Sequence, residues 1–136
     1  MSTLFRALLL GAVLSAGCAT DAGQPKDAAW GKQPCEECAM LLSDPHHGAQ
    51  LVTTDGERLY FDDLGCMAEW SIEHPRQAER QWVRTEDTQQ WILAEHARFQ
   101  RGRQSPMGFG LVASSDAGEM NWAEASTFVE QRLRER

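Results

Sequence analysis

The sequence predicts one α+β domain, and three observations lead to this expectation. Its 136 residues allow one domain at most. Asp55-Gly56 separates two short runs rich in β-branched and aromatic residues, a pattern typical of an antiparallel hairpin. Segments with helical spacing then alternate with further strand-like runs. Strands and helices therefore interleave, in a sheet that is at least partly antiparallel.

The hairpin is expected over residues 48–61, and a helix follows it over residues 62–74. Asp62 or Asp63 can cap the start of this helix, and Pro75 ends it. Its apolar residues recur at the spacing of one helix face, at Leu64, Met67, Ala68 and Ile72.

The next part of the chain contains less regular signals. Residues 80–85 predict a third strand, and residues 106–114 predict a glycine-rich loop that leads into a strand. Residues 89–103 fit either a strand or a helix, and the sequence leaves both possibilities open.

The clearest helix is expected over residues 121–136. Asn121 and Glu124 form a capping-box pair, and arginines concentrate in the last turns, where the helix dipole favours them. The predicted buried stripe consists of Trp122, Val129 and Leu133.

The N-terminus predicts export. Residues 1–17 contain a single charge, Arg6, followed by a short apolar run that ends in small residues, as in a secretory signal. Cys18 comes directly after this run, which favours a bacterial lipoprotein that is cleaved and acylated there; an ordinary signal with a free Cys18 is the alternative. Residues 18–34 are polar and rich in Ala, Gly and Pro, which predicts a flexible tether. Residues 35–136 then form the domain.

Composition excludes several classes of function. The formal net charge of −7 argues against nucleic-acid binding, which requires clustered Lys and Arg. The sequence also lacks an acid/base pair, a Ser/His/Asp order or a phosphate-binding loop that rises above chance. We therefore expect neither an enzyme nor a small-molecule substrate.

Sulfur is concentrated at the start of the domain, in the sequence CEECAM at residues 35–40. If this segment is extended, Cys38 and Met40 point to the same side, with Cα atoms about 6.5 Å apart. A thioether is a poor ligand for zinc but a good one for Cu(I), because soft ligands select soft ions. A structural zinc site would also require four Cys or His ligands.

Other interpretations of these residues remain open. Cys35 and Cys38 can form a disulfide in an oxidising compartment, either as an inert crosslink or as a redox pair. Against the redox pair, the segment leads into a proline turn, and both intervening residues are glutamates, whose charge would raise a thiol pKa. Met40 can also be an ordinary core methionine.

Four more residues are secondary or supporting candidates. Cys66 and Met67 are adjacent but fall on the predicted helix, where burial in the core is the simpler explanation. Met107 lies on a glycine-flanked loop, where it can join a Cys/Met site. His46 follows a proline in a turn and can complete a copper site, although exposure to solvent is the usual state of such a histidine.

Three segments follow one another in a set order: CEECAMLLSDPHHGAQLVTTDGERLYFDDLGCM, WILAEHARFQRGR and SPMGFGLVAS. Together, over residues 35–115, they resemble the NosL family. The resemblance implies a fold of two small ββαβ-like units. It also implies an exported, lipid-anchored metallochaperone that faces the periplasm and carries one Cu(I) per protomer. The implied recipient is the membrane-associated complex that assembles the copper clusters of nitrous oxide reductase.

The same resemblance implies the ligands. Cys38 and Met40 match the Cys-x-Met ligands of the family, and Met107 matches the methionine of its Pro-Met-Gly loop. Cys35 belongs to the Cys-x-x-Cys branch of the family, as a ligand or as a redox partner. Ala39 stands where the family pattern has glycine.

Overall fold

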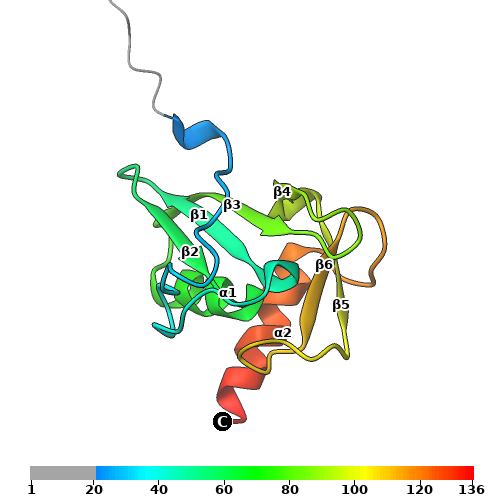
Figure 1. Ribbon diagram of the computed structural model, residues 1–136. Helices are drawn as coiled ribbons and strands as arrows, with labels where there is room; N and C mark the ends of the chain where they lie inside the picture. Colours follow the sequence, from blue (N-terminus) through cyan, green and yellow to red (C-terminus); the bar gives the residue numbers. More distant parts are fainter. Residues whose placement is uncertain (1–20) are drawn as a thin grey trace, which may run out of the picture.

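The computed structural model describes residues 21–136, which form two antiparallel sheets and two α-helices (Figure 1). The larger sheet has four strands in the order β2-β1-β3-β4, and the smaller one pairs β5 with β6. A parallel bridge between Thr85, which directly follows β3, and Ala113 of the smaller sheet connects the two sheets. The predicted α+β class is confirmed.

The first unit has the order ββαβ. Strands β1 (Ala49–Thr53) and β2 (Arg58–Phe61) form the predicted hairpin around Asp55-Gly56, and Gly56 has a φ of 91° that suits glycine. Helix α1 (Leu64–Glu73) follows, and strand β3 (Ala78–Arg84) returns to pair with β1. Each of these elements was expected from the sequence.

The ambiguous segment forms mainly extended structure. Strand β4 (Trp91–Leu93) pairs with β3, a 3₁₀ turn occupies Ala94–His96, and strand β5 (Arg98–Arg101) begins the second sheet. Apolar side chains alone could not decide between strand and helix here, because pairing partners determine strand formation.

The second unit ends in a helix. Strand β6 (Leu111–Ser114) pairs with β5, and helix α2 (Trp122–Arg134) follows with the predicted capping box of Asn121 and Glu124. Within the described residues this unit has two strands and one helix. Val129 is fully buried, whereas the two other predicted stripe residues, Trp122 and Leu133, are half-buried.

The two helices pack against each other below the sheets, and α1 also contacts β1, β2 and β6 (Figure 1). Neither helix in the described part of the chain is long and apolar enough to cross a membrane. The core between helices and sheets is built from large side chains that solvent does not reach, among them Leu51, Phe61, Leu64, Met67, Phe99, Phe109 and Leu111. This core holds the start of α1 rigidly in the middle of the molecule.

Residues 21–34, the described part of the predicted tether, lie against the larger sheet. The backbone of Lys26 exchanges two hydrogen bonds with the side-chain amide of Gln50, at 3.0 and 2.7 Å. Trp30 stacks on Trp91 of β4, with ring centroids 6.4 Å apart. The folded unit therefore begins before Cys35. The predicted signal over residues 1–17 and the predicted anchor at Cys18 lie outside the described residues.

Candidate metal centre

Three cysteines meet beside the first turn of α1. The Sγ atoms of Cys35, Cys38 and Cys66 all lie within 4.8 Å of one another, and all three residues carry free thiols. Cys35 and Cys66 are 2% and 1% exposed, whereas Cys38 is half-buried. This arrangement, called the thiol cluster below, is closed toward the core and accessible through Cys38.

The cysteine loop, residues 35–40, is a tight turn. The N–H of Ala39 donates to the carbonyl of Cys35 at 2.9 Å, and the N–H of Cys35 donates to the carbonyl of Met40 at 2.7 Å. Ala39 closes the turn with a left-handed φ of 61°. Glycine adopts this conformation without strain, whereas the Cβ of alanine makes it unfavourable.

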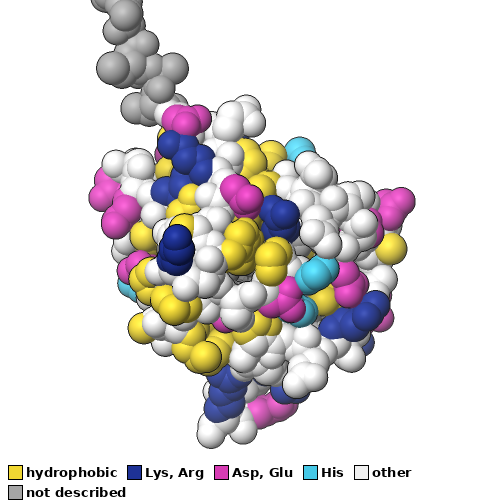
Figure 2. All heavy atoms as spheres, in the orientation of Figure 1, with side chains coloured by type: hydrophobic (Ala, Val, Ile, Leu, Met, Phe, Trp, Pro, Cys, Tyr) yellow, Lys and Arg dark blue, Asp and Glu magenta, His cyan; other side chains and the backbone are white. Residues whose placement is uncertain are grey.

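The condition under which Cys38 and Met40 would point to the same side, an extended segment, is therefore not met. Cys38 is directed into the thiol cluster, while Met40 is 54% exposed. Figure 2 shows hydrophobic side chains at the surface at lower left, where Figure 1 places the loop that precedes β1. Met40 thus lies at the surface beside the cluster.

Asp62 connects the segment after the cysteine loop to the start of α1. Its carboxylate is fully buried and accepts hydrogen bonds from the backbone N–H of Ser43, at 2.6 Å, and from the Ser43 hydroxyl. Its own backbone amide forms a hydrogen bond with the Cys35 sulfur. A single residue therefore holds the loop and one of its thiols in place.

Asp63 connects α1 to a second loop, the Pro-Met-Gly loop at residues 105–110. One carboxylate oxygen accepts the N–H of Gly65 and caps the helix at 2.8 Å; the other accepts the N–H of Met107 at 2.9 Å. A Cβ on Gly65 would lie 2.1 Å from the ring of Phe109, so only glycine allows the loop to pack this closely. The half-buried Met107 is thereby held at the first turn of the helix that carries Cys66.

The protons of the cluster are distributed unequally. The Cys66 thiol donates to the Cys35 sulfur and, together with backbone amides of the loop, lowers the pKa of Cys35 to about 5. The pKa of Cys66 is raised, first because its proton is held in this hydrogen bond and then because of burial. Burial also raises the pKa of Cys38. Cys35 is therefore the most acidic of the three thiols, whereas the glutamates were expected to raise a thiol pKa; the pKa of Cys38 is raised, but by burial first.

Carboxylates surround the outer side of the cluster. Glu37 of the cysteine loop and Glu69 and Glu73 of α1 have carboxylate oxygens within 4.8 Å of one another. Burial and the charges of the two helix glutamates raise the pKa of Glu37 to about 7. The Cys35 thiolate adds to the rise in pKa of both Glu37 and Glu69, so this carboxylate cluster is close to the sulfurs.

Two candidate ligands predicted from the sequence do not join the thiol cluster: His46 lies away from it, and Met67 lies inside the core. Both ring nitrogens of His46 have other partners: Nδ1 lies 2.8 Å from Asp44 and Nε2 lies 3.0 Å from Gln89. Met67 is fully buried in the core. The structure thus brings together Cys35, Cys38 and Cys66, with Met107 nearby, and leaves His46 apart.

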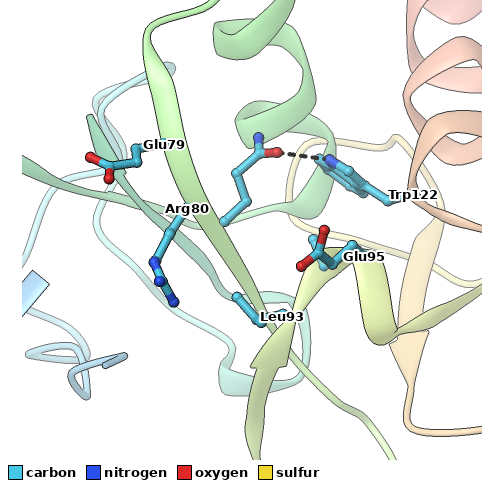
Figure 3. Close-up of a pocket in the computed structure, with 7 residues that line it drawn as sticks. Glu79, Arg80, Leu93, Glu95 and Trp122 are labelled. Carbon is cyan, nitrogen blue, oxygen red and sulfur yellow. Dashed lines mark hydrogen bonds between the residues drawn. The ribbon is translucent and has the colours of Figure 1, made fainter. Parts of the chain in front are cut away.

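A separate polar cleft lies between β3, β4 and the start of α2 (Figure 3). The indole N–H of Trp122 donates to Oε1 of Gln81 across it at 3.0 Å. The residues that line it are Glu79, Arg80, Gln81, Leu93, Ala94, Glu95 and Trp122. No cysteine, methionine or histidine is among the residues that line this cleft.

The spacing of the thiols suits one soft metal ion. A metal at about 2.3 Å from each of three sulfurs would separate them by about 4 Å, within the spread observed here. Thiolates select Cu(I), zinc and iron–sulfur clusters, and a structural zinc site requires a fourth ligand that the described Cys and His residues do not place within this group. The geometry therefore fits a three-coordinate soft ion.

Sequence reasoning ranked Cys66 below Cys35 and Cys38, because a cysteine on a helix is most simply buried. It also treated Asp62 and Asp63 only as possible helix caps. The sequence signal for their role is that the two aspartates stand just before a helix start and a Gly-Cys pair. Only the fold shows that each aspartate holds a different loop.

Comparison with known proteins agrees with the expected fold. No protein-family model matches the sequence, and neither does any curated protein. Among solved structures, the chain is similar to the copper chaperone NosL from Shewanella denitrificans, with a TM-score of 0.62 and 19% sequence identity. The similarity covers 79% of this chain and 87% of the NosL chain. The chain therefore has the NosL fold, as the resemblance of its sequence motifs implied.

Proposed function

We propose that the protein binds one Cu(I) at the thiol cluster and carries it to an acceptor protein. The single observation that carries this proposal is the convergence of three free sulfurs, from the cysteine loop and from α1, within 4.8 Å of one another. The similarity to a copper chaperone supports copper over other soft ions.

The ligands do different work in this proposal. Cys35 and Cys66 form the buried part of the site, and Cys38 is the sulfur that solvent and an acceptor can reach. Met107, whose backbone N–H is bound by Asp63 at the start of α1, contributes a thioether in this proposal, and the exposed Met40 receives the ion as it leaves. Release requires such an accessible ligand, because an ion enclosed by three buried thiolates exchanges slowly.

The finer parts of the proposal come from the sequence. Export by the signal at residues 1–17, acylation of Cys18, and a position on the periplasmic side of the membrane would place the carrier beside membrane-bound acceptors. By resemblance, the acceptor is the complex that assembles the copper clusters of nitrous oxide reductase. In this role the protein performs no catalysis.

A competition titration tests the copper site. The reduced protein is titrated against a chromogenic Cu(I) chelator, and the affinity is compared among Cys35→Ser, Cys38→Ser and Cys66→Ser variants. Loss of a residue that only supports a metal ligand weakens metal affinity by roughly 10- to 100-fold. Each of these substitutions removes a direct ligand, so each should weaken Cu(I) affinity by more than that. His46→Gln is the control and should bind like the native protein; unchanged affinity in all three serine variants would refute the site.

One observation favours a second function, thiol–disulfide exchange. The Cys66 hydrogen bond and nearby backbone amides lower the pKa of Cys35, which lies next to two further thiols and is the most acidic of the three. Against it, Cys35 is 2% exposed, and the cysteine loop does not begin a helix. Turnover of a small disulfide substrate by the protein, lost in Cys35→Ser, would favour this function over copper transport.

A further inference from the structure

Three large hydrophobic side chains are exposed in residues 21–136. They are Met40, Leu41 and Ile72, with exposed fractions of 54%, 51% and 39%. All three belong to the two segments that carry the cysteines: Met40 and Leu41 follow Cys38, and Ile72 lies on α1. Exposed apolar side chains that gather around a site are typical of a surface that another protein covers.

The carboxylate cluster comes from the same two segments of the chain as these apolar residues. Glu37 precedes Met40 on the loop, while Glu69 and Glu73 flank Ile72 on the helix. Within the described residues, none of the three glutamates has an ion-pair partner. The positive charge that acts on Glu69 is Arg136, but its guanidinium donates to the carbonyl of Met107 and lies 4.3 Å from the ring centroid of Phe109.

When ionised, the three carboxylates repel one another, and His74 and Arg136 offset this repulsion only in part, because the pKa values of Glu37 and Glu69 are still raised. The repulsion is relieved when a surface of opposite charge covers them, and this complementarity also raises the rate of encounter. We propose that Met40, Leu41 and Ile72, together with the carboxylate cluster, form a docking surface for a basic protein that takes the metal ion from the thiol cluster. The inference rests on the proposed function, because it identifies the partner of the same site.

Charge excludes the other simple occupants of this surface. A second copy of the chain carries the same carboxylates and a formal net charge of −7, so it would add repulsion. An anionic membrane surface is repelled for the same reason. A basic acceptor that presents a thioether or imidazole between lysines or arginines fits both the apolar residues and the charge.

The test uses the full chain loaded with Cu(I) and two synthetic acceptor peptides. Both peptides contain the same methionines and histidine for Cu(I), flanked by lysines in one and by glutamates in the other. The rate of Cu(I) transfer is measured for each at low and high ionic strength. We expect transfer to the lysine peptide to be faster by about tenfold at low salt, and this preference to fall as salt screens the charges.

Two variants, matched in the charge they remove, identify the surface. Replacing Glu37, Glu69 and Glu73 by glutamine should abolish the preference for the lysine peptide. The control replaces Glu79, Glu95 and Asp116 by their amides, which removes the same charge away from the cysteines and should keep the preference within about twofold of the native protein. Leu41→Ser should slow transfer to both peptides, because it removes apolar contact area without changing charge.

The outcomes separate this inference from the proposed function. A chelator titration of each variant first establishes that it still binds Cu(I); failure of the native protein at this stage contradicts the copper site itself. Equal rates to the two peptides, with normal Cu(I) binding, would overturn the docking surface alone. Self-association of the chain that depends on Leu41 would also overturn it, in favour of a second copy as the occupant.

Discussion

Two loops meet at the start of α1, and they are built in opposite ways. The cysteine loop at residues 35–40 is held by backbone hydrogen bonds within itself and by Asp62, and it leaves Met40 exposed. The Pro-Met-Gly loop at residues 105–110 is held by packing, because Phe109 is 1% exposed and lies against Gly65. The outer end of the cysteine loop faces solvent at Met40, whereas the Pro-Met-Gly loop is anchored in the core through Phe109.

The difference between the two loops shows how a small domain can hold one side of a site in the core and leave the other side of the same site accessible to solvent. Packing of Phe109 against Gly65 and the hydrogen bond from Met107 to Asp63 fix this loop against the helix start on the buried side of the site. Local hydrogen bonds are sufficient for the cysteine loop, whose outer side has to exchange partners during release. Stability and accessibility are thus assigned to different loops, and substitutions can test this division.

The largest expected effect is on folding, at the packed loop. Phe109→Ala removes a fully buried aromatic side chain and should lower the free energy of unfolding by about 3–5 kcal/mol. Leu41→Ala, next to the cysteine loop, should change it by no more than about 0.5 kcal/mol, because this side chain is 51% exposed. Chemical denaturation measures both values, and similar losses in the two variants would contradict the contrast between the loops.

A smaller effect of opposite sign is expected at the turn of the cysteine loop. Ala39 has a φ of 61°, a conformation that costs an alanine about 1 kcal/mol relative to glycine. Ala39→Gly should therefore raise the free energy of unfolding by up to about 1 kcal/mol and leave Cu(I) affinity unchanged. The same denaturation experiment checks the gain, and Ala117→Gly, at an exposed position where φ is not positive, serves as the control that should show none. Destabilisation by Ala39→Gly would show that the turn differs from the one described.

The smallest effect concerns pH and Glu37. Its pKa is raised from 4.5 to about 7 in the folded protein, so the folded state holds this proton more tightly than the unfolded state. The contribution of Glu37 to stability therefore decreases as pH rises from about 4.5 to about 7, and the full penalty remains above that range. Glu37→Gln should melt at a higher temperature than the native metal-free protein at pH 8 and at nearly the same temperature at pH 4.

Glu36→Gln is the matched control for this experiment, because Glu36 is the exposed neighbour of Glu37 and lies outside the carboxylate cluster. It should follow the native protein at both pH values. An equal gain at pH 8 in both variants would mean that general negative charge, rather than the carboxylate cluster, is responsible.

Local signals predicted most of the fold. Asp55-Gly56 defined the hairpin, the paired aspartates and Pro75 limited α1, and Asn121 with Glu124 began α2, because turns and caps depend on neighbouring residues. Residues 89–103 could not be interpreted in this way. Their strands depend on partners in β3 and β6, which lie outside the segment itself.

The sequence by itself determined which chemistry is available: a sulfur-rich segment, a glycine-flanked methionine loop and an acidic chain, all of them properties of residue type and local spacing. Tertiary structure alone decided which sulfurs meet. Cys66 is separated from Cys35 by a complete hairpin, and only the packing of α1 against the sheets brings their sulfurs within 4.8 Å. It also turned Met40 outward, because Ala39 adopts a left-handed conformation in the closed turn. Contacts between distant segments arise from the burial of a shared core, and no local pattern records them.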